Sequence, residues 1–157
     1  MNTKEYHFAF TVYDSVNELS KADAALLHEA RTVTKNAYAP YSNFNVAAVA
    51  SLSNGEIVAG TNQENASYPV GICAERVLLS IVASLHPSAT INTIAIAYNN
   101  LNGESNKPIS PCGMCRQAFA EYETRKNQSF RLLLSGMEGE VYLIDKASQL
   151  MPLSFSL

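Results

Sequence analysis

Three cysteines, all at the starts of predicted helices, constrain the fold of this chain more than any other feature. Cys112 and Cys115 form a C-x-x-C pair in the segment SPCGMCRQ, and Cys73 opens another helical segment in PVGICAERVLLS. A C-x-x-C pair can be a redox couple, half of a structural zinc site or part of a catalytic one. The pair alone does not distinguish these possibilities. If one metal binds all three thiols, the two helix starts must lie side by side.

Composition favours a single soluble domain. The chain has 157 residues, of which 47% are hydrophobic and 16% charged, so we expect one domain over residues 1–157, with residues 1–19 as an N-terminal extension. The net charge of −3 argues against a nucleic-acid partner, because such proteins usually carry a basic patch. No apolar run is long enough for a membrane span, and the N-terminus lacks the pattern of a signal peptide. The odd cysteine count does not fit a secreted disulfide framework, so we expect reduced thiols and a cytoplasmic location.

Turn residues and hydrophobic periodicity predict helices that alternate with short strands. Ser20 is a candidate N-cap for a helix that continues to about Tyr38, and Asn54-Gly55 predicts a tight hairpin turn. Two further helices are expected, at residues 73–85 and 112–124. Strands are expected at residues 7–15, 44–52, 56–63, 91–99, 129–136 and 140–145, and a short helix and tail at 146–155. This order of elements indicates a layered α/β domain with a mixed sheet.

The residues around the cysteines favour a catalytic metal site. Helix N-termini carry a partial positive charge that lowers thiol pKa values and favours thiolate, the form that binds metal. The chain has no fourth cysteine, and its histidines (His7, His28 and His86) lie outside these segments. Three protein ligands with a vacant fourth position are typical of catalytic zinc. Glu75 follows Cys73 by two residues, where its carboxylate could take a proton from a water activated by the metal.

The C-A-E segment at Cys73 followed by P-C-x-x-C at Cys112 matches the zinc nucleoside deaminase signature. Separated blocks extend the match in order and spacing, namely YAPYSNFNVAAV, GTNQENASYPVGICAER, ISPCGMCRQAF and the ending LMPLSF. They cover roughly residues 38–155, and on them the chain resembles the small, three-cysteine cytidine deaminases. The resemblance implies a three-layer α/β/α sandwich around a five-stranded mixed sheet, to which the N-terminal segment would add a strand. It also implies a homotetramer with pockets shared between subunits, one zinc ion per subunit, and deamination of cytidine and 2′-deoxycytidine in pyrimidine salvage.

The resemblance also implies roles for individual residues. Cys73, Cys112 and Cys115 would hold zinc, and Glu75 would shuttle protons. The substrate would be bound by Phe44 at the base, Asn62 and Glu64 at the sugar, the backbone of Ala66 at the cytosine edge, and Tyr68 and Phe155 from a neighbouring subunit. Arg76 and Gln117 would hydrogen-bond the thiolates. An independent argument supports Arg76, because zinc with three thiolates carries a net negative charge that a nearby cation would offset.

The chain departs from the pattern of this family beside the base-packing residue. Asn45 and Ala47 in FNVAAV stand where many members have FPVGAA, and YPVG stands where YGLT is commoner. Three alternatives stay open on the residues alone. They are a related deaminase with another substrate, a module in which zinc only joins two helices, and a thiol redox protein that works without zinc. Glu75 favours catalysis over the structural module, because a structural site has no need of a carboxylate beside the metal.

Overall fold

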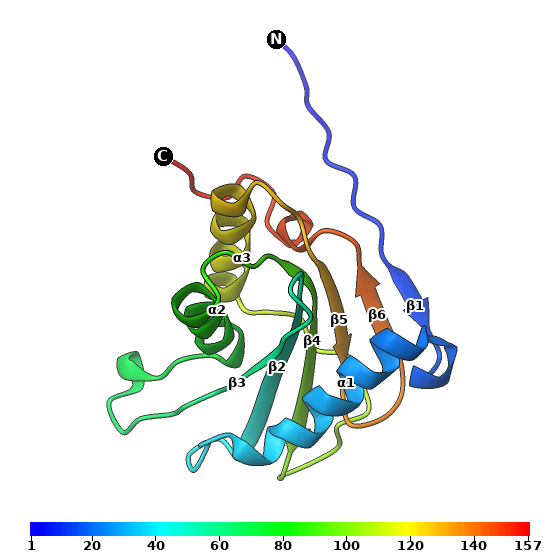
Figure 1. Ribbon diagram of the computed structural model, residues 1–157, viewed down its shortest axis with the longest axis vertical. Coiled ribbons are helices and arrows are strands. Elements are labelled where there is room, and N and C mark those ends of the chain that lie inside the picture. Colours follow the sequence, from blue (N-terminus) through cyan, green and yellow to red (C-terminus); the bar gives the residue numbers. More distant parts are fainter.

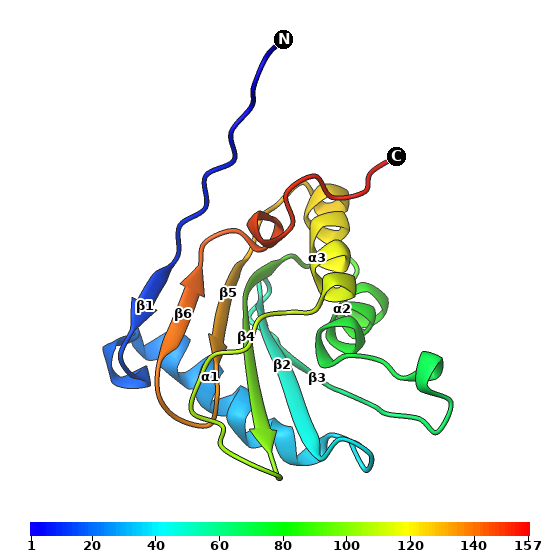
Figure 2. The same cartoon turned by 180° about the vertical axis from the view of Figure 1, so that it is seen from behind.

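The structure, a computed structural model, describes residues 1–157 as one six-stranded sheet between two layers of helix (Figure 1). The strands are β1 (Thr11–Tyr13), β2 (Phe44–Leu52), β3 (Ile57–Thr61), β4 (Ile91–Asn100), β5 (Arg131–Ser135) and β6 (Val141–Ile144). The helices are α1 (Lys21–Val33), α2 (Ala74–Leu85) and α3 (Gly113–Lys126). Helix α1 covers one face of the sheet, and α2 and α3 cover the other (Figure 2). The predicted sandwich and its additional N-terminal strand are therefore confirmed.

The strand order is β1-β6-β5-β4-β2-β3. All neighbouring strands are antiparallel except β4 and β5, which are parallel. Parallel neighbours need a long crossover, and the chain supplies it as the segment that contains α3. The predicted hairpin joins β2 to β3, with Gly55 at a φ of +87°, a backbone conformation that glycine adopts without strain.

Helix α1 begins where the sequence predicts but ends earlier. The Ser20 hydroxyl caps it by accepting a hydrogen bond from the Asp23 backbone N–H at 3.1 Å. The helix stops at Val33 because the Thr34 hydroxyl bonds back to the Arg31 carbonyl at 2.7 Å and a short 3₁₀ turn follows. The chain then turns toward the sheet, where the Tyr38 backbone N–H donates to the carbonyl of Asn62.

The N-terminal strand is shorter than residues 7–15. Thr11 pairs with Leu143, and β6 ends only one residue later at Ile144. The residues before Phe10 therefore run past the end of their partner strand and form an extended arm (Figure 1).

The face of α2 that meets the sheet is apolar, and the two backbones approach closely there. Leu78 and Val82 are fully buried, and burial of each such side chain contributes about 1.5–3 kcal/mol. Gly60 on β3 permits the close approach, since a Cβ at this position would lie 2.5 Å from the Leu78 backbone nitrogen and 2.7 Å from the Ala74 carbonyl oxygen. The absence of a side chain at residue 60 thus fixes how deeply the start of α2 sits on the sheet.

We predict that Gly60→Ala destabilises the protein by about 1–3 kcal/mol, because the added methyl group pushes α2 away from β3. Urea unfolding followed by circular dichroism measures the change. Gly113→Ala is the matched control, since a Cβ at residue 113 would meet no atom within 4 Å. Equal stability of the two variants would contradict the role given to Gly60.

Candidate metal and active site

The starts of α2 and α3 meet and bring the three thiols together. Cys73 is the N-cap residue of α2, Cys112 is the N-cap residue of α3, and Cys115 lies in the first turn of α3. Their sulfur atoms all lie within 4.8 Å of one another. The Sγ atoms of Cys73 and Cys112 are 3.8 Å apart, and those of Cys112 and Cys115 are 3.5 Å apart.

These separations fit zinc. Two thiolates of a tetrahedral zinc ion, each bonded at about 2.3 Å, lie about 3.8 Å from each other. Cys115 is buried, Cys73 is half-buried and Cys112 is exposed, so one side of the cluster is open to solvent. The cysteines therefore supply three of the four positions around a zinc ion and leave the fourth free for water or substrate.

Hydrogen bonding between the thiols favours thiolate at Cys73, although burial and the Glu75 charge oppose it. A hydrogen bond from the Cys115 thiol is the main cause that lowers the pKa of Cys73 to about 6, and the positive charge of Arg76 acts in the same direction. Arg76 thus lies close enough to act on the cluster electrostatically, although it makes no hydrogen bond to a sulfur atom. A coordinating metal would deprotonate all three thiols.

Glu75 lies in the first turn of α2 and is only 5% exposed. Burial raises the pKa of its carboxyl group, while hydrogen bonds from its own backbone N–H and from Cys115 partly oppose that rise. A bound zinc cation would also oppose it. The structure therefore places one buried, titratable carboxyl group beside the three thiols, as a proton shuttle requires.

Hydrogen bonds hold both helix starts in place. Before α2, the backbones of Gln63 and Ile72 exchange two hydrogen bonds of 3.0 Å, which close the loop that leads into Cys73. At α3, the Arg116 Nε donates to the Pro111 carbonyl at 2.8 Å, and the Arg116 Nη1 donates to the Leu150 carbonyl at 3.2 Å. The positions of the thiols therefore depend on contacts with residues outside the two helices.

Asn62 and Glu64 lie together beside the start of β2. The Asn62 side chain accepts from the Val46 N–H at 2.7 Å and donates to the Phe44 carbonyl at 2.9 Å. The Glu64 carboxylate accepts from the backbone N–H groups of Tyr41 and Ser42. A hydrogen bond from the Ser42 hydroxyl is the largest of the causes that lower the pKa of Glu64, so this group is a carboxylate at neutral pH.

Two of the predicted pocket aromatics lie on the surface. Tyr68 is 76% exposed and Phe155 is 71% exposed. Tyr68 and Tyr41 meet edge to face, with ring centroids 6.0 Å apart, at a pocket of about 390 Å³ that Glu64 also lines. Ala66 is exposed in the loop that runs from Glu64 to Tyr68.

Gln117 binds the C-terminal segment. Its side-chain amide donates to the Phe155 carbonyl at 2.9 Å and accepts from the Phe155 N–H at 3.0 Å. Its predicted bond to a thiolate is not among its contacts in this structure, and that role stays a prediction.

Sequence reasoning missed Arg116, Tyr41 and Tyr98. Tyr98 on β4 stacks against Phe44, with ring centroids 4.8 Å apart and planes 15° apart. The residue types gave no signal of these contacts, because each depends on which strands and loops become neighbours.

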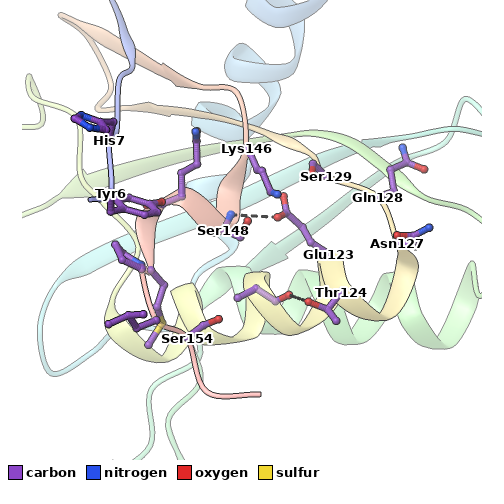
Figure 3. A pocket seen from close by; sticks show the side chains of 15 residues that line it. Tyr6, His7, Glu123, Thr124, Asn127, Gln128, Ser129, Lys146, Ser148 and Ser154 are labelled. Atoms are coloured by element: carbon purple, nitrogen blue, oxygen red, sulfur yellow. Dashed lines mark hydrogen bonds between the residues drawn. The ribbon is translucent and has the colours of Figure 1, made fainter. Parts of the chain in front are cut away.

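A second, polar cavity of about 630 Å³ lies between the N-terminal arm, the end of α3 and the C-terminal segment (Figure 3). None of the predicted site residues lines it. Glu123 lies at its floor, where the buried carboxylate accepts from the backbone N–H groups of Phe130, Ala147 and Ser148. Its carboxylate is therefore already bonded, and Glu123 joins α3 to the C-terminal segment.

Comparison with known proteins agrees with this geometry. The family model described as "Cytidine and deoxycytidylate deaminase zinc-binding region" matches residues 20–129. The chain belongs to this deaminase family. Zinc is the cofactor of the matched region, and Cys73, Cys112 and Cys115 are the residues that could hold it. No helix combines the length and the apolar character needed to cross a bilayer.

Individual relatives of this deaminase family match most of the chain. The cytidine deaminase of Mycoplasma genitalium is 38% identical over 106 residues, which are 67% of this chain and 76% of that protein. The cytidine deaminase of Halalkalibacterium halodurans is 33% identical over 131 residues, which are 83% of this chain and 92% of that protein. The crystal structure of cytidine deaminase from Burkholderia pseudomallei matches with a TM-score of 0.71 and 34% identity, over 87% of this chain and 100% of that one.

We predict that Cys73→Ala, Cys112→Ala and Cys115→Ala each reduce bound zinc from one ion per chain to about zero, since two thiolates hold zinc weakly. Plasma emission spectrometry of the purified proteins measures the zinc content. Met114→Ala is the matched control, because Met114 lies between two of the cysteines and is 62% exposed. Full zinc content in Cys73→Ala would contradict the assignment of this ligand.

Proposed function

We propose that this protein hydrolyses the bond between C4 and the amino group of cytidine and 2′-deoxycytidine, giving uridine and 2′-deoxyuridine with release of ammonia. The observation that carries the proposal is the buried Glu75 carboxyl in the first turn of α2, beside three thiols that leave a fourth metal position free. The names of the relatives support the same reaction. A structural zinc site would need neither the free position nor the carboxylate.

Glu75 carries out the proton transfers in this proposal. Zinc, when bound by the three cysteines, supplies the Lewis acidity that makes attack by water at C4 of the base possible near neutral pH. The Glu75 carboxylate takes the proton from the attacking water and delivers it to N3 of the base. The carboxylate then takes the second proton, from the hydroxyl group that the water has left on C4, and transfers it to the amino group. The C4–N bond breaks, the C4 carbonyl of the uridine product forms, and ammonia leaves. Burial keeps the carboxyl group dry, which strengthens its interaction with the base.

Asn62 and Glu64 are proposed to bind the sugar hydroxyl groups. Their present bonds to the backbone of residues 41–46 hold both side chains in fixed positions, and Glu64 is ionised and able to accept from a hydroxyl. A site with fixed polar groups discriminates strongly against ligands that lack the matching hydroxyls. This argument favours a free nucleoside over the free base.

Four further roles are proposed around these groups. Phe44 packs against the base, and the Ala66 backbone reads its polar edge. Arg76 reduces the negative charge of zinc with three thiolates, and its effect on Cys73 supports that role. Gln117 assists at the thiolates after exchanging its bonds to Phe155. In a reducing cytoplasm, where the thiols stay free, the reaction would return cytosine nucleosides to the uridine pool in pyrimidine salvage.

The active unit is proposed to be a homotetramer in which neighbouring subunits share pockets. The contact between the exposed rings of Tyr68 and Tyr41 supports this arrangement, because groups of exposed apolar side chains often mark protein–protein contacts.

We expect light scattering to give the mass of four chains. Plasma emission spectrometry should give one zinc ion per chain. Tyr68→Ser and Phe155→Ser should lower activity more than stability, since both side chains are exposed within their own chain. Leu153→Ser is the matched control, because Leu153 is also an exposed apolar residue and lies near Phe155 in the sequence. A fully active monomer would refute the shared pocket.

A substrate panel on zinc-loaded protein, followed by ammonia release, tests the proposed reaction. The panel contains cytidine, deoxycytidine, cytosine, deoxycytidine monophosphate, guanine and adenosine. We predict turnover of the two cytosine nucleosides only, and a loss of kcat by about 10²- to 10⁴-fold or more in Glu75→Gln with zinc retained. Turnover of another compound would show that the roles proposed for the substrate-binding residues are wrong. Zinc loss in Glu75→Gln would show that Glu75 has a structural role. No turnover of any compound by zinc-loaded protein would contradict the proposal.

A further inference from the structure

The ring of Phe44 has one face covered by another ring of the same chain. Tyr98 stacks against it, with centroids 4.8 Å apart and planes 15° apart. Tyr98 is only 6% exposed, whereas Phe44 is half-buried. Phe44 therefore presents its other face or its edge to the outside, and Tyr98 lies behind it.

Strand register places this pair on the same side of the sheet as the metal site. Val46 is directly opposite Tyr98 across the β2–β4 pairing, and Val46 packs against the core under α2 and α3. Phe44 lies two residues before Val46, so its side chain projects from the same face. The stacked rings thus lie on the face whose two helices begin at Cys73 and Cys112.

The pair also lies at the end of the strands from which the chain leaves the sheet for both helix starts. Strand β2 begins at Phe44, and Asn62, which bonds to the Phe44 carbonyl, opens the loop to Cys73. Strand β4 ends at Asn100, which pairs with Phe44 and opens the segment to Cys112. A base held beside the thiols would meet Phe44 at this end of the strands.

The backbone and the ring of Phe44 are fixed by different groups. The Phe44 carbonyl accepts from Asn62, and the Phe44 N–H donates to the Ser42 hydroxyl at 3.1 Å. These bonds fix the main chain but leave rotation of the phenyl ring free. The Tyr98 ring removes that freedom by stacking, and its hydroxyl makes no hydrogen bond within the chain, so the ring face is the part that acts.

We propose that Tyr98 is a positioning residue for substrate binding, which sets the plane of Phe44 so that its free face or edge meets the cytosine base. This inference rests on the proposed function. A planar base binds an aromatic ring in a narrow range of orientations, so a ring already held in one plane loses less conformational freedom when the base binds. Tyr98 therefore acts on substrate affinity through Phe44 and not on the proton transfers at Glu75.

The test compares Tyr98→Leu, which removes the ring, with Tyr98→Phe, which keeps it. We expect Tyr98→Leu to raise KM for cytidine by about three- to tenfold, the effect of losing one aromatic pair, with kcat changed less than about twofold. Tyr98→Phe should restore KM. Affinity for uridine, measured by calorimetry, should fall by the same factor as KM rises. Zinc content and circular dichroism should match those of the wild type.

A double-mutant cycle decides whether Tyr98 acts through Phe44. In a Phe44→Leu background, Tyr98→Leu should add no further increase in KM. Tyr142→Leu is the matched control, because it removes a tyrosine ring from β6 that packs against Phe10 and not against Phe44, and it should leave KM unchanged. If Tyr98→Leu does not fold, Tyr98→Met removes the ring with similar volume and is judged by the same measurements.

A KM for Tyr98→Leu within about twofold of the wild type, or additive effects in the double mutant, would overturn the inference while turnover by the wild type upholds the proposed function. Wild-type protein that does not turn over cytidine would overturn the proposed function and this inference with it. The wild-type measurement therefore separates the two failures before any variant is compared.

Discussion

The meeting of two helix N-termini at three cysteine sulfurs is the constraint on which the rest of the structure depends. Each helix reaches this point by a separate route. Helix α2 is seated on β3 by the close backbone approach at Gly60, and α3 is held by the bonds from Arg116 to Pro111 and Leu150. The resulting sulfur separations of 3.5 and 3.8 Å already match those around a tetrahedral zinc ion. The scaffold therefore builds the metal site without any ligand outside these two helix starts.

The same construction links the metal site to the substrate side. The segment that ends β3 bonds to the start of β2 through Asn62 and Glu64, and its Gln63 pairs with Ile72 just before Cys73. One short stretch of chain thus connects the groups proposed to bind the sugar with the first metal ligand. Since the Asn62 and Glu64 side chains bond to backbone atoms here, a change in this stretch would move both sides of the site together.

Sequence alone predicted the parts of this site that depend on local spacing. Cys73 and Glu75 share one helical turn, as do Cys112 and Cys115. Helix geometry therefore predicts that the two members of each pair lie close together. The strands and the hairpin at Asn54-Gly55 followed from period and turn chemistry. The end of α1 was predicted too late, because the hydroxyl of Thr34 and the hydrogen bond from Tyr38 to Asn62, just after β3, stop the helix.

Contacts between distant segments could not be predicted in the same way. Tyr98 becomes the neighbour of Phe44 only through the register of β2 with β4, and Arg116 finds Leu150 only after the C-terminal segment returns to α3. Glu123 reads as an ordinary helix glutamate in the sequence, yet it is buried and binds three backbone N–H groups. These residues carry no distinctive spacing, so only the folded chain reveals what they do.

The most direct test of this account is a crystal structure of the zinc-loaded protein with uridine, the proposed product. The account predicts one metal ion bonded to the sulfurs of Cys73, Cys112 and Cys115, with the base between Glu75 and Phe44 and the sugar at Asn62 and Glu64. A metal closed off by a fourth protein ligand would contradict it. Uridine bound in the cavity beside Glu123, away from the cysteines, would contradict it as well.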